Sequence, residues 1–370
     1  MNKVRLSKCS LSSLEKEAVS DVLDNEHLGM GQETQQFEIA VAEFLGIDSK
    51  FFAAVNTGTS ALHIALSAIG ISPGDEVLVP SLTYVASFQA ISACGAIPVS
   101  CEVTDETLFI DVEDARKKIT ANTKAIMPVH YASSSLGISE VYELAKQHNL
   151  RVIEDAAQAF GCKTLDKSVG SSGDIICFSF DGIKNITCGE GGGVVAFDDM
   201  TISNVKDMRL LGVKKDTEKR YAGQRSWDFD VELQGFRYHM SNINAAIGLA
   251  QLSRIEEFAH NRKRIVKKYL VSFKDFSNLR TLKLDYDNII SHVFIVLVDR
   301  RDDLREYLLS KNIEVGIHYK PNHLLSKFSV GVDLPMTESI YNRLLTLPIH
   351  NDLTDEQQNY VIESIYEFYR

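Results

Sequence analysis

The chain lacks the features that mark export or a membrane span. No uninterrupted apolar stretch is long enough to cross a bilayer. The first residues, Met1 to Lys8, hold no apolar core of signal-peptide length. The six cysteines are scattered and form no C-x-x-C pair, so we expect reduced thiols, several of them buried. These absences together predict a cytoplasmic protein.

An excess of positive charge is also missing. The formal net charge is −11, which argues against non-specific nucleic-acid binding through phosphate neutralisation. Hydrophobic residues make up 45% and charged residues 24%, as in ordinary globular proteins. A chain of 370 residues exceeds what one compact core usually holds, so two domains are expected.

Short apolar runs alternate with helix-like segments through the first part of the chain. Helices are predicted at 14–24, 34–45, 59–69, 84–93 and 140–148, and strands at 51–55, 76–80, 97–103, 124–129 and 151–155. This alternation predicts an α/β fold, in which a mostly parallel sheet is flanked by helices. We place it in a large domain, residues 1–245, whose N-terminal helices can pack on the rest of the chain.

The pattern of predicted helices and strands changes after residue 245. One long helix is predicted over 245–269, followed by a strand at 291–298 and helices at 301–310 and 354–369. We therefore expect a smaller C-terminal α+β domain, residues 246–370, which the long helix connects to the large domain.

Lys184 has the most unusual surroundings of any lysine. It follows the strand-like run 177–180, and glycine-rich residues 189–193 come soon after it. Most lysines lie on exposed loops. Here the lysine interrupts an apolar stretch, and the glycines let the backbone approach a ligand closely. An amine in such a loop can form a Schiff base with pyridoxal 5′-phosphate (PLP).

Asp155 closes the apolar strand 151–155, at the end where ligands lie in open α/β sheets. A carboxylate there can pair with a pyridinium nitrogen, and Gln158 can then reach the ring hydroxyl. Capping of the next helix explains Asp155 equally well.

Other residues suit a phosphate or a ring. Gly58 and Thr59 stand where a strand gives way to a helix, whose free N–H groups bind anions. Plain helix capping is the commoner explanation of such a segment. Ser179 can donate to the same phosphate or be an ordinary strand serine. Tyr84 can stack on the cofactor ring or belong to the core.

Two polar clusters remain open to interpretation. Basic residues crowd into 214–225, as either a loop over a diphosphate or a solvated surface. His318, Tyr319 and His323 form an aromatic cluster that suits a sugar-contacting lining. Carboxylates and cysteines at useful spacing are missing there, so we expect no metal site.

The ordered set of motifs resembles the DegT/StrS family of sugar-nucleotide aminotransferases, which are fold-type-I PLP enzymes. The segments that carry the resemblance are 57–62, 80–84, 154–158, 178–180 with Lys184, 189–192, 316–319 and 347–350. The resemblance implies an aspartate-aminotransferase-like fold and a homodimer with shared active sites. It also implies transfer of an amino group from L-glutamate to a nucleoside-diphosphate-linked keto sugar.

The resemblance assigns roles residue by residue. Lys184 matches the Schiff-base lysine, and pyridoxamine 5′-phosphate is the cofactor's intermediate form. The remaining matches are Asp155 to the pyridine nitrogen, Gln158 to the ring hydroxyl, Gly58, Thr59 and Ser179 to the phosphate, and Tyr84 to the ring face. The acceptor it favours is a 4-keto-6-deoxyhexose, for an amino sugar of a surface polysaccharide or glycosylated metabolite.

One segment departs from the family pattern G-x-N-x-R-M, because residues 235–240 read GFRYHM. Arg237 replaces an asparagine that reaches the partner subunit's cofactor phosphate, and a guanidinium can bind the same anion. Two alternatives stay open: transamination of a 3-keto sugar or a keto-inositol, and a non-catalytic sensor on the same scaffold. The sensor would need a partner-binding appendage.

Overall fold

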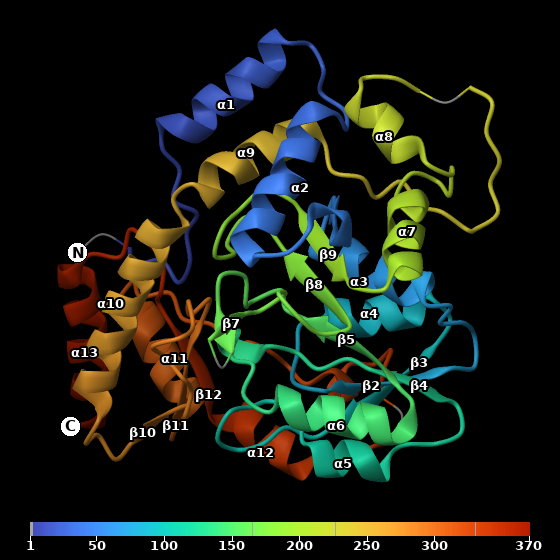
Figure 1. Ribbon diagram of the computed structural model, residues 1–370. Helices are drawn as coiled ribbons and strands as arrows, with labels where there is room; N and C mark the ends of the chain where they lie inside the picture. Colours follow the sequence, from blue (N-terminus) through green and yellow to red (C-terminus); the bar gives the residue numbers. More distant parts are fainter. Residues whose placement is uncertain (1–2, 165, 226, 330) are drawn as a thin grey trace.

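The computed structural model describes residues 3–164, 166–225, 227–329 and 331–370, and it has an α/β architecture (Figure 1). The strands are β1 Phe52–Val55, β2 Glu76–Pro80, β3 Ile97–Cys101, β4 Thr123–Ile126, β5 Arg151–Asp155, β6 Lys163–Thr164, β7 Lys167–Ser168, β8 Ile175–Ser179, β9 Gly192–Ala196, β10 Leu279–Thr281, β11 Phe294–Val298 and β12 Leu344–Leu347. The first helices are α1 Ser13–Asp24, α2 Gln32–Leu45, α3 Gly58–Ala68, α4 Val85–Ala93, α5 Val112–Lys117, α6 Ile138–His148 and α7 Asp199–Met208. The others are α8 Asp216–Tyr221, α9 Asn242–Leu252, α10 Ile255–Phe273, α11 Arg301–Ser310, α12 Pro335–Arg343 and α13 Asp355–Tyr369.

A seven-stranded sheet forms the centre, in the order β1-β9-β8-β5-β4-β2-β3. The pairs β8–β5, β5–β4, β4–β2 and β2–β3 are parallel, whereas β1–β9 and β9–β8 are antiparallel. The predicted mostly parallel sheet is confirmed. Apolar side chains cover both of its faces, as such a sheet requires.

Helices cover both faces of this sheet, which is the middle of three layers (Figure 1). Helices α3, α4 and α7 pack on one face, where Ile64 and Phe88 meet Val79. On the other face α2 and α9 cover the β1–β8 end, and α5 and α6 cover the β2–β4 end. The strands around the site are therefore held from both sides.

A second, three-stranded antiparallel sheet, β10-β11-β12, lies beside helices α10, α11 and α13. Its inner residues, including Val296 and Leu345, form a separate core. Val4 joins that core and pairs with Ile313, so the segment before α1 also packs there. The predicted division at residue 245 falls inside α9 and remains a prediction.

The single helix predicted over 245–269 is wrong, because the chain forms α9 and α10 with a break between them. Arg254 leaves the helical region with φ −107° and ψ 6°. Its guanidinium donates to the Ser10 carbonyl and to Glu15. A tertiary contact thus ends one helix where the local pattern favours continuation.

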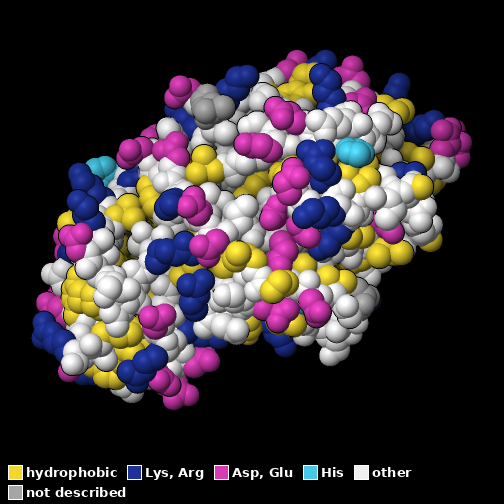
Figure 2. Space-filling view, turned by 90° about the horizontal axis from the view of Figure 1, so that it is seen from below, with side chains coloured by type: hydrophobic (Ala, Val, Ile, Leu, Met, Phe, Trp, Pro, Cys, Tyr) yellow, Lys and Arg dark blue, Asp and Glu magenta, His cyan; other side chains and the backbone are white. Residues whose placement is uncertain are grey.

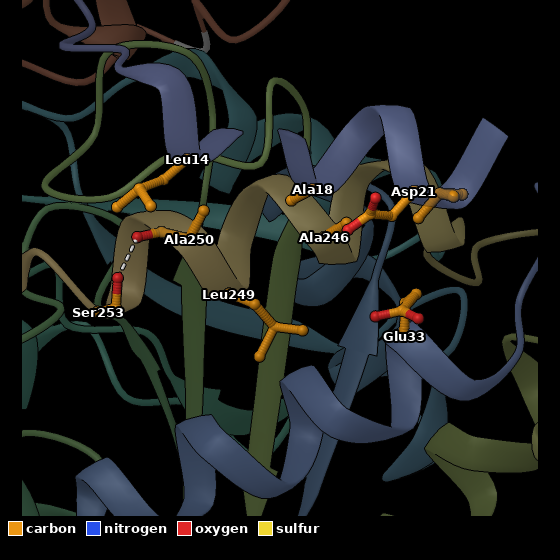
Figure 3. A pocket seen from close by; sticks show the side chains of 9 residues that line it. Leu14, Ala18, Asp21, Glu33, Ala246, Leu249, Ala250 and Ser253 are labelled. Atoms are coloured by element: carbon orange, nitrogen blue, oxygen red, sulfur yellow. Dashed lines mark hydrogen bonds between the residues drawn. The ribbon is translucent and has the colours of Figure 1, made fainter. Parts of the chain in front are cut away.

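Helix α9 also forms the floor of a shallow groove beneath α1 (Figure 3). Leu14 and Ala18 of α1 line it together with Ala246 and Leu249 of α9. The small alanine side chains let the two helices approach closely, which anchors the N-terminal helix on the large sheet's helical layer.

The six cysteines are free thiols, as predicted, and four of them are buried. In the described ranges no helix is both long and apolar enough to cross a bilayer. Figure 2 shows lysine and arginine interspersed with aspartate and glutamate over one face, so the net negative charge does not gather there as a single patch.

Candidate active site

One cavity of about 510 Å³ opens where β5 and β8 end and α3 begins. It brings together nine predicted residues: Gly58, Thr59, Tyr84, Asp155, Gln158, Ser179, Lys184, His318 and Tyr319. His318 and Tyr319 come from the C-terminal part of the chain, far in sequence from the other seven residues. The chain's topology thus gathers side chains that are up to 261 positions apart in the sequence, from Gly58 to Tyr319.

The start of α3 is built to accept an anion. Thr57 caps the helix, because its Oγ1 accepts the Ser60 N–H at 3.0 Å and its own N–H donates to the Ser60 Oγ at 3.1 Å. In the part of the chain that the structure describes, the amides of Gly58 and Thr59 keep no acceptor of their own. Free amides at a helix start form an anion site.

Glycine at position 58 keeps this site open. A Cβ there would lie 2.7 Å from the Ser179 Cβ and 2.9 Å from its Oγ. Any side chain would therefore fill the space between the helix start and Ser179. The helix cap is present, and its geometry leaves room for the predicted anion site beside it.

Asp155 is buried and held from several sides. Its Oδ2 accepts from the Ser87 hydroxyl at 2.7 Å, and its Oδ1 accepts from the Ala157 N–H at 3.2 Å. Its backbone is bonded to Pro128 and His130 of the neighbouring chain segment. The carboxylate therefore has a fixed orientation at the cavity wall, as a residue that pairs with a ring nitrogen requires.

Lys184 lies half-buried in a turn, where its N–H donates to the Asp181 carbonyl at 3.1 Å. Burial lowers the pKa of its ammonium, and the Asp155 and Asp181 carboxylates oppose that shift in part. Burial is the larger cause, because removing a cation from water favours the neutral amine. A neutral amine is the form that attacks a carbonyl.

Gln158 links two walls of the cavity. Its Oε1 accepts from the Ala132 N–H at 2.9 Å, and its Nε2 donates to the Tyr319 hydroxyl at 3.3 Å. The Tyr319 ring lies 5.4 Å from that of Tyr84, centroid to centroid. Tyr84 itself is 58% exposed at the cavity mouth, so its ring face is free to meet a ligand.

Two histidines also line the cavity, His292 and the predicted His318. The Nδ1 of His318 lies 2.8 Å from the Thr346 hydroxyl. Burial and then the charge of Lys184 lower the pKa of His318 to about 4. Burial, and then the charges of Lys184, Arg262 and His318, lower the pKa of His292 well below its ordinary value. Both rings are therefore neutral near pH 7.

Two predicted residues lie outside the cavity. His323 is buried against Ser81, with Nδ1 2.7 Å from that hydroxyl, and its Nε2 lies 3.2 Å from Glu338. His323 is not among the residues that line this cavity, and its contact with the sugar remains a prediction. Arg237 is exposed on the strand-like segment that pairs with Leu210. Its predicted contact is with a partner subunit.

The sequence analysis missed Ser87, Asp181, Glu190 and His292. Ser87 lies three residues after Tyr84, so helical spacing alone places both on one side of α4 and could have identified it. Asp181 follows the strand-like run 177–180 directly, and Glu190 lies within the glycine-rich segment 189–193, so both flank the Lys184 turn. His292 had no signal, since it is a single histidine before a buried strand.

Comparison with known proteins places this geometry in a family. Residues 10–366 match the model of the DegT/DnrJ/EryC1/StrS aminotransferase family. GDP-perosamine synthase of Escherichia coli O157:H7 is 38% identical over 367 residues, which cover 97% of each chain.

Solved structures agree with this match. The aminotransferase TlmJ from Streptoalloteichus hindustanus superposes with a TM-score of 0.92 at 28% identity, covering 99% of this chain and 98% of that one. The PLP-form of the putative sugar aminotransferase Spr1654 from Streptococcus pneumoniae has a TM-score of 0.90 at 26% identity, covering 98% and 97%. The predicted aspartate-aminotransferase-like fold of type I is confirmed.

The cavity also fits the cofactor that these relatives use. The open amides at Gly58 and Thr59 suit a phosphate, the fixed carboxylate of Asp155 suits a ring nitrogen, and the amine of Lys184 suits an aldehyde. These groups surround one cavity of about 510 Å³. The chain belongs to the DegT/DnrJ/EryC1/StrS aminotransferase family and is a PLP-dependent sugar aminotransferase.

Proposed function

We propose that this enzyme transfers an amino group from L-glutamate to a nucleoside-diphosphate-linked keto sugar, with a 4-keto-6-deoxyhexose as the acceptor. The observation that carries the proposal is the meeting of Lys184, Asp155 and the start of α3 around one cavity. The similarity to a protein named GDP-perosamine synthase supports a nucleotide-linked sugar.

Each residue of the site has a separate role in this proposal. When bound, PLP supplies an aldehyde that takes the amino group and a ring that accepts electron density. The Nζ of Lys184 removes the α-proton of glutamate and later returns a proton to the sugar carbon that receives the amino group. Asp155 holds the proton of the ring nitrogen, in the orientation that Ser87 and Ala157 fix. Gly58, Thr59 and Ser179 bind the phosphate.

The charges of the residues that line the cavity favour a homodimer with shared active sites. The described lining of the cavity includes three carboxylates, those of Asp155, Asp181 and Glu190, but Lys184 as its one lysine or arginine. The ligands proposed for it are nevertheless anionic, so further cations are needed. The exposed Arg237 of a second copy can supply one, in keeping with its position in the family pattern. We also propose a cytoplasmic location, where nucleotide-linked sugars and free thiols are expected together.

An amino-transfer assay tests the proposal. Purified enzyme is incubated with L-glutamate and one class of acceptor at a time: nucleotide-linked 4-keto sugars, nucleotide-linked 3-keto sugars or a keto-inositol. The products are identified by mass spectrometry. The proposal expects 2-oxoglutarate and an amino sugar with the 4-keto acceptors. Amination of the keto-inositol alone, or no amination by an enzyme that retains its cofactor, would contradict it.

A further inference from the structure

We propose that His292 donates a hydrogen bond from its Nε2–H to a neutral oxygen, carbonyl or hydroxyl, of the amino acceptor. This inference rests on the proposed function, since it assigns a contact within the same cavity. It makes His292 a specificity residue for the second half of the reaction, in which the sugar receives the amino group.

The position of His292 is fixed by its backbone. Its N–H donates to the Ser133 hydroxyl at 2.9 Å, and its carbonyl accepts from the Arg262 guanidinium at 3.3 Å. The residue is only 5% exposed, yet it lines the cavity together with Lys184. A buried polar ring held at a cavity wall is placed to meet a ligand rather than bulk water.

The tautomer follows from the surroundings of the ring. Nδ1 is buried without a hydrogen-bond partner among the described residues. A proton on Nδ1 would therefore leave a buried N–H unsatisfied, which folded proteins largely avoid. The neutral ring carries one proton, so that proton belongs on Nε2. Since His292 lines the cavity, we infer that Nε2 is the nitrogen that faces it and that its N–H is available to a ligand's acceptor.

The character of this wall favours the sugar over glutamate. Beside His292 stand the neutral ring of His318 and the Tyr319 hydroxyl, which accepts from Gln158 and keeps its own proton to donate. Uncharged donors suit the carbonyl and hydroxyl oxygens of a sugar. The two carboxylates of glutamate instead call for cations, whereas the side chains of His292, His318 and Tyr319 are uncharged.

Three variants separate the roles of the two ring nitrogens. His292→Gln carries its amide N–H₂ about as far from the backbone as Nε2, whereas the shorter His292→Asn places it near the position of Nδ1. His292→Phe keeps the ring volume and has no donor. His260→Gln is the control, because His260 is exposed on α10.

Each half-reaction is followed alone, in single turnovers, through the absorbance of the bound cofactor. We expect His292→Phe and His292→Asn to slow the reaction with the keto sugar by about 10-fold, the effect of one lost hydrogen bond. The reaction with glutamate should stay near the wild-type rate. His292→Gln should recover most of the lost rate, and His260→Gln should change neither half-reaction.

The inference is overturned if His292→Phe slows both half-reactions equally or neither of them. It is also overturned if His292→Gln and His292→Asn behave alike, a comparison that remains available should the phenylalanine variant fail to fold. A wild-type enzyme that reacts with glutamate but with no keto sugar contradicts the proposed acceptor first, so the two failures are distinguishable.

Discussion

Ser87 is the residue whose contribution is easiest to isolate, because one hydroxyl joins it to Asp155 at 2.7 Å. Ser87→Ala leaves one carboxylate oxygen without its donor, which costs about 1.5–3 kcal/mol for a bond to a charged group. We expect kcat to fall by about 10- to 100-fold. Ser87→Thr keeps the hydroxyl and is the matched control. Equal activity of Ser87→Ala and wild type, in steady-state assays, would show that Ser87 does not orient Asp155.

Lys184 makes the stability of the cofactor-free protein depend on pH. The ordinary pKa of a lysine, which applies to the unfolded chain, is 10.5, and the pKa of Lys184 in the folded protein is lower. At pH values between the two, the unfolded chain binds more protons than the folded one. The free energy of unfolding therefore rises with pH across that window. Lys184→Met removes this rise. It should increase the free energy of unfolding at pH values below the window, where the wild type buries an ammonium.

Urea unfolding of the cofactor-free protein at several pH values measures this difference. The exposed Lys16→Met of α1 is the control and should keep the wild-type slope. Parallel pH dependences for wild type and Lys184→Met would mean that the amine is not buried in the absence of cofactor.

Among single residues, those that occur within ordered motifs, such as Asp155 and Lys184, could be predicted from the sequence to lie at one site. His292 could not be predicted in this way, because a tertiary approach of a distant segment brings that ring to the cavity. His323 shows the converse. Its polar neighbours in the chain favoured a sugar contact, whereas in the structure it contacts Ser81 and Glu338 and does not line the cavity.

Among the elements, the start of α3 offers the most direct test of its proposed role as a phosphate site. Gly58→Ala would place a Cβ 2.7 Å from the Ser179 Cβ, in the space proposed for the phosphate. We expect the Kd for PLP to rise by about 10-fold or more, since overpacking of this kind typically costs 1–3 kcal/mol. Equilibrium titration of the apoenzyme measures it.

Gly248→Ala in α9 is the matched control for that change. Its Cβ would meet the Cys188 Sγ at 2.5 Å and Phe37 at 2.6 Å, so it is overpacked as well, but among core residues. Both variants should lower the melting temperature, and only Gly58→Ala should weaken PLP binding beyond that loss. Equal weakening by the two would assign the effect to general destabilisation.

Elements with a clear period were predicted well, as α1, α2 and α6 show. Strand β9 (Gly192–Ala196) was missed because its glycines suggested a loop, whereas close packing against β1 and β8 makes it a central strand. The break between α9 and α10 was missed because its cause, the contact of Arg254 with Ser10 and Glu15, is not local.

At the scale of the whole molecule, a shared active site predicts complementation between two inactive variants. Lys184→Ala and Arg237→Ala are each expected to be impaired, the second through weaker cofactor binding. In a hybrid dimer one site would combine Lys184 of one chain with Arg237 of the other. Co-expression with two different tags and purification of the hybrid should then recover up to about half of the wild-type activity per dimer.

An arrangement in which both residues act within one chain gives a different result, since every site of the hybrid would then carry a defect. Recovery no greater than the sum of the parent activities would contradict the shared site. A hybrid of Lys184→Ala with itself, under the two tags, controls for effects of co-expression.

The central claim is that Lys184 forms the covalent link to PLP. Borohydride reduction of the purified holoenzyme fixes that link, and peptide mapping by mass spectrometry then locates it. We predict one modified peptide, with the pyridoxyl phosphate group on the Nζ of Lys184. Modification of any other lysine in its place would contradict the account of the site.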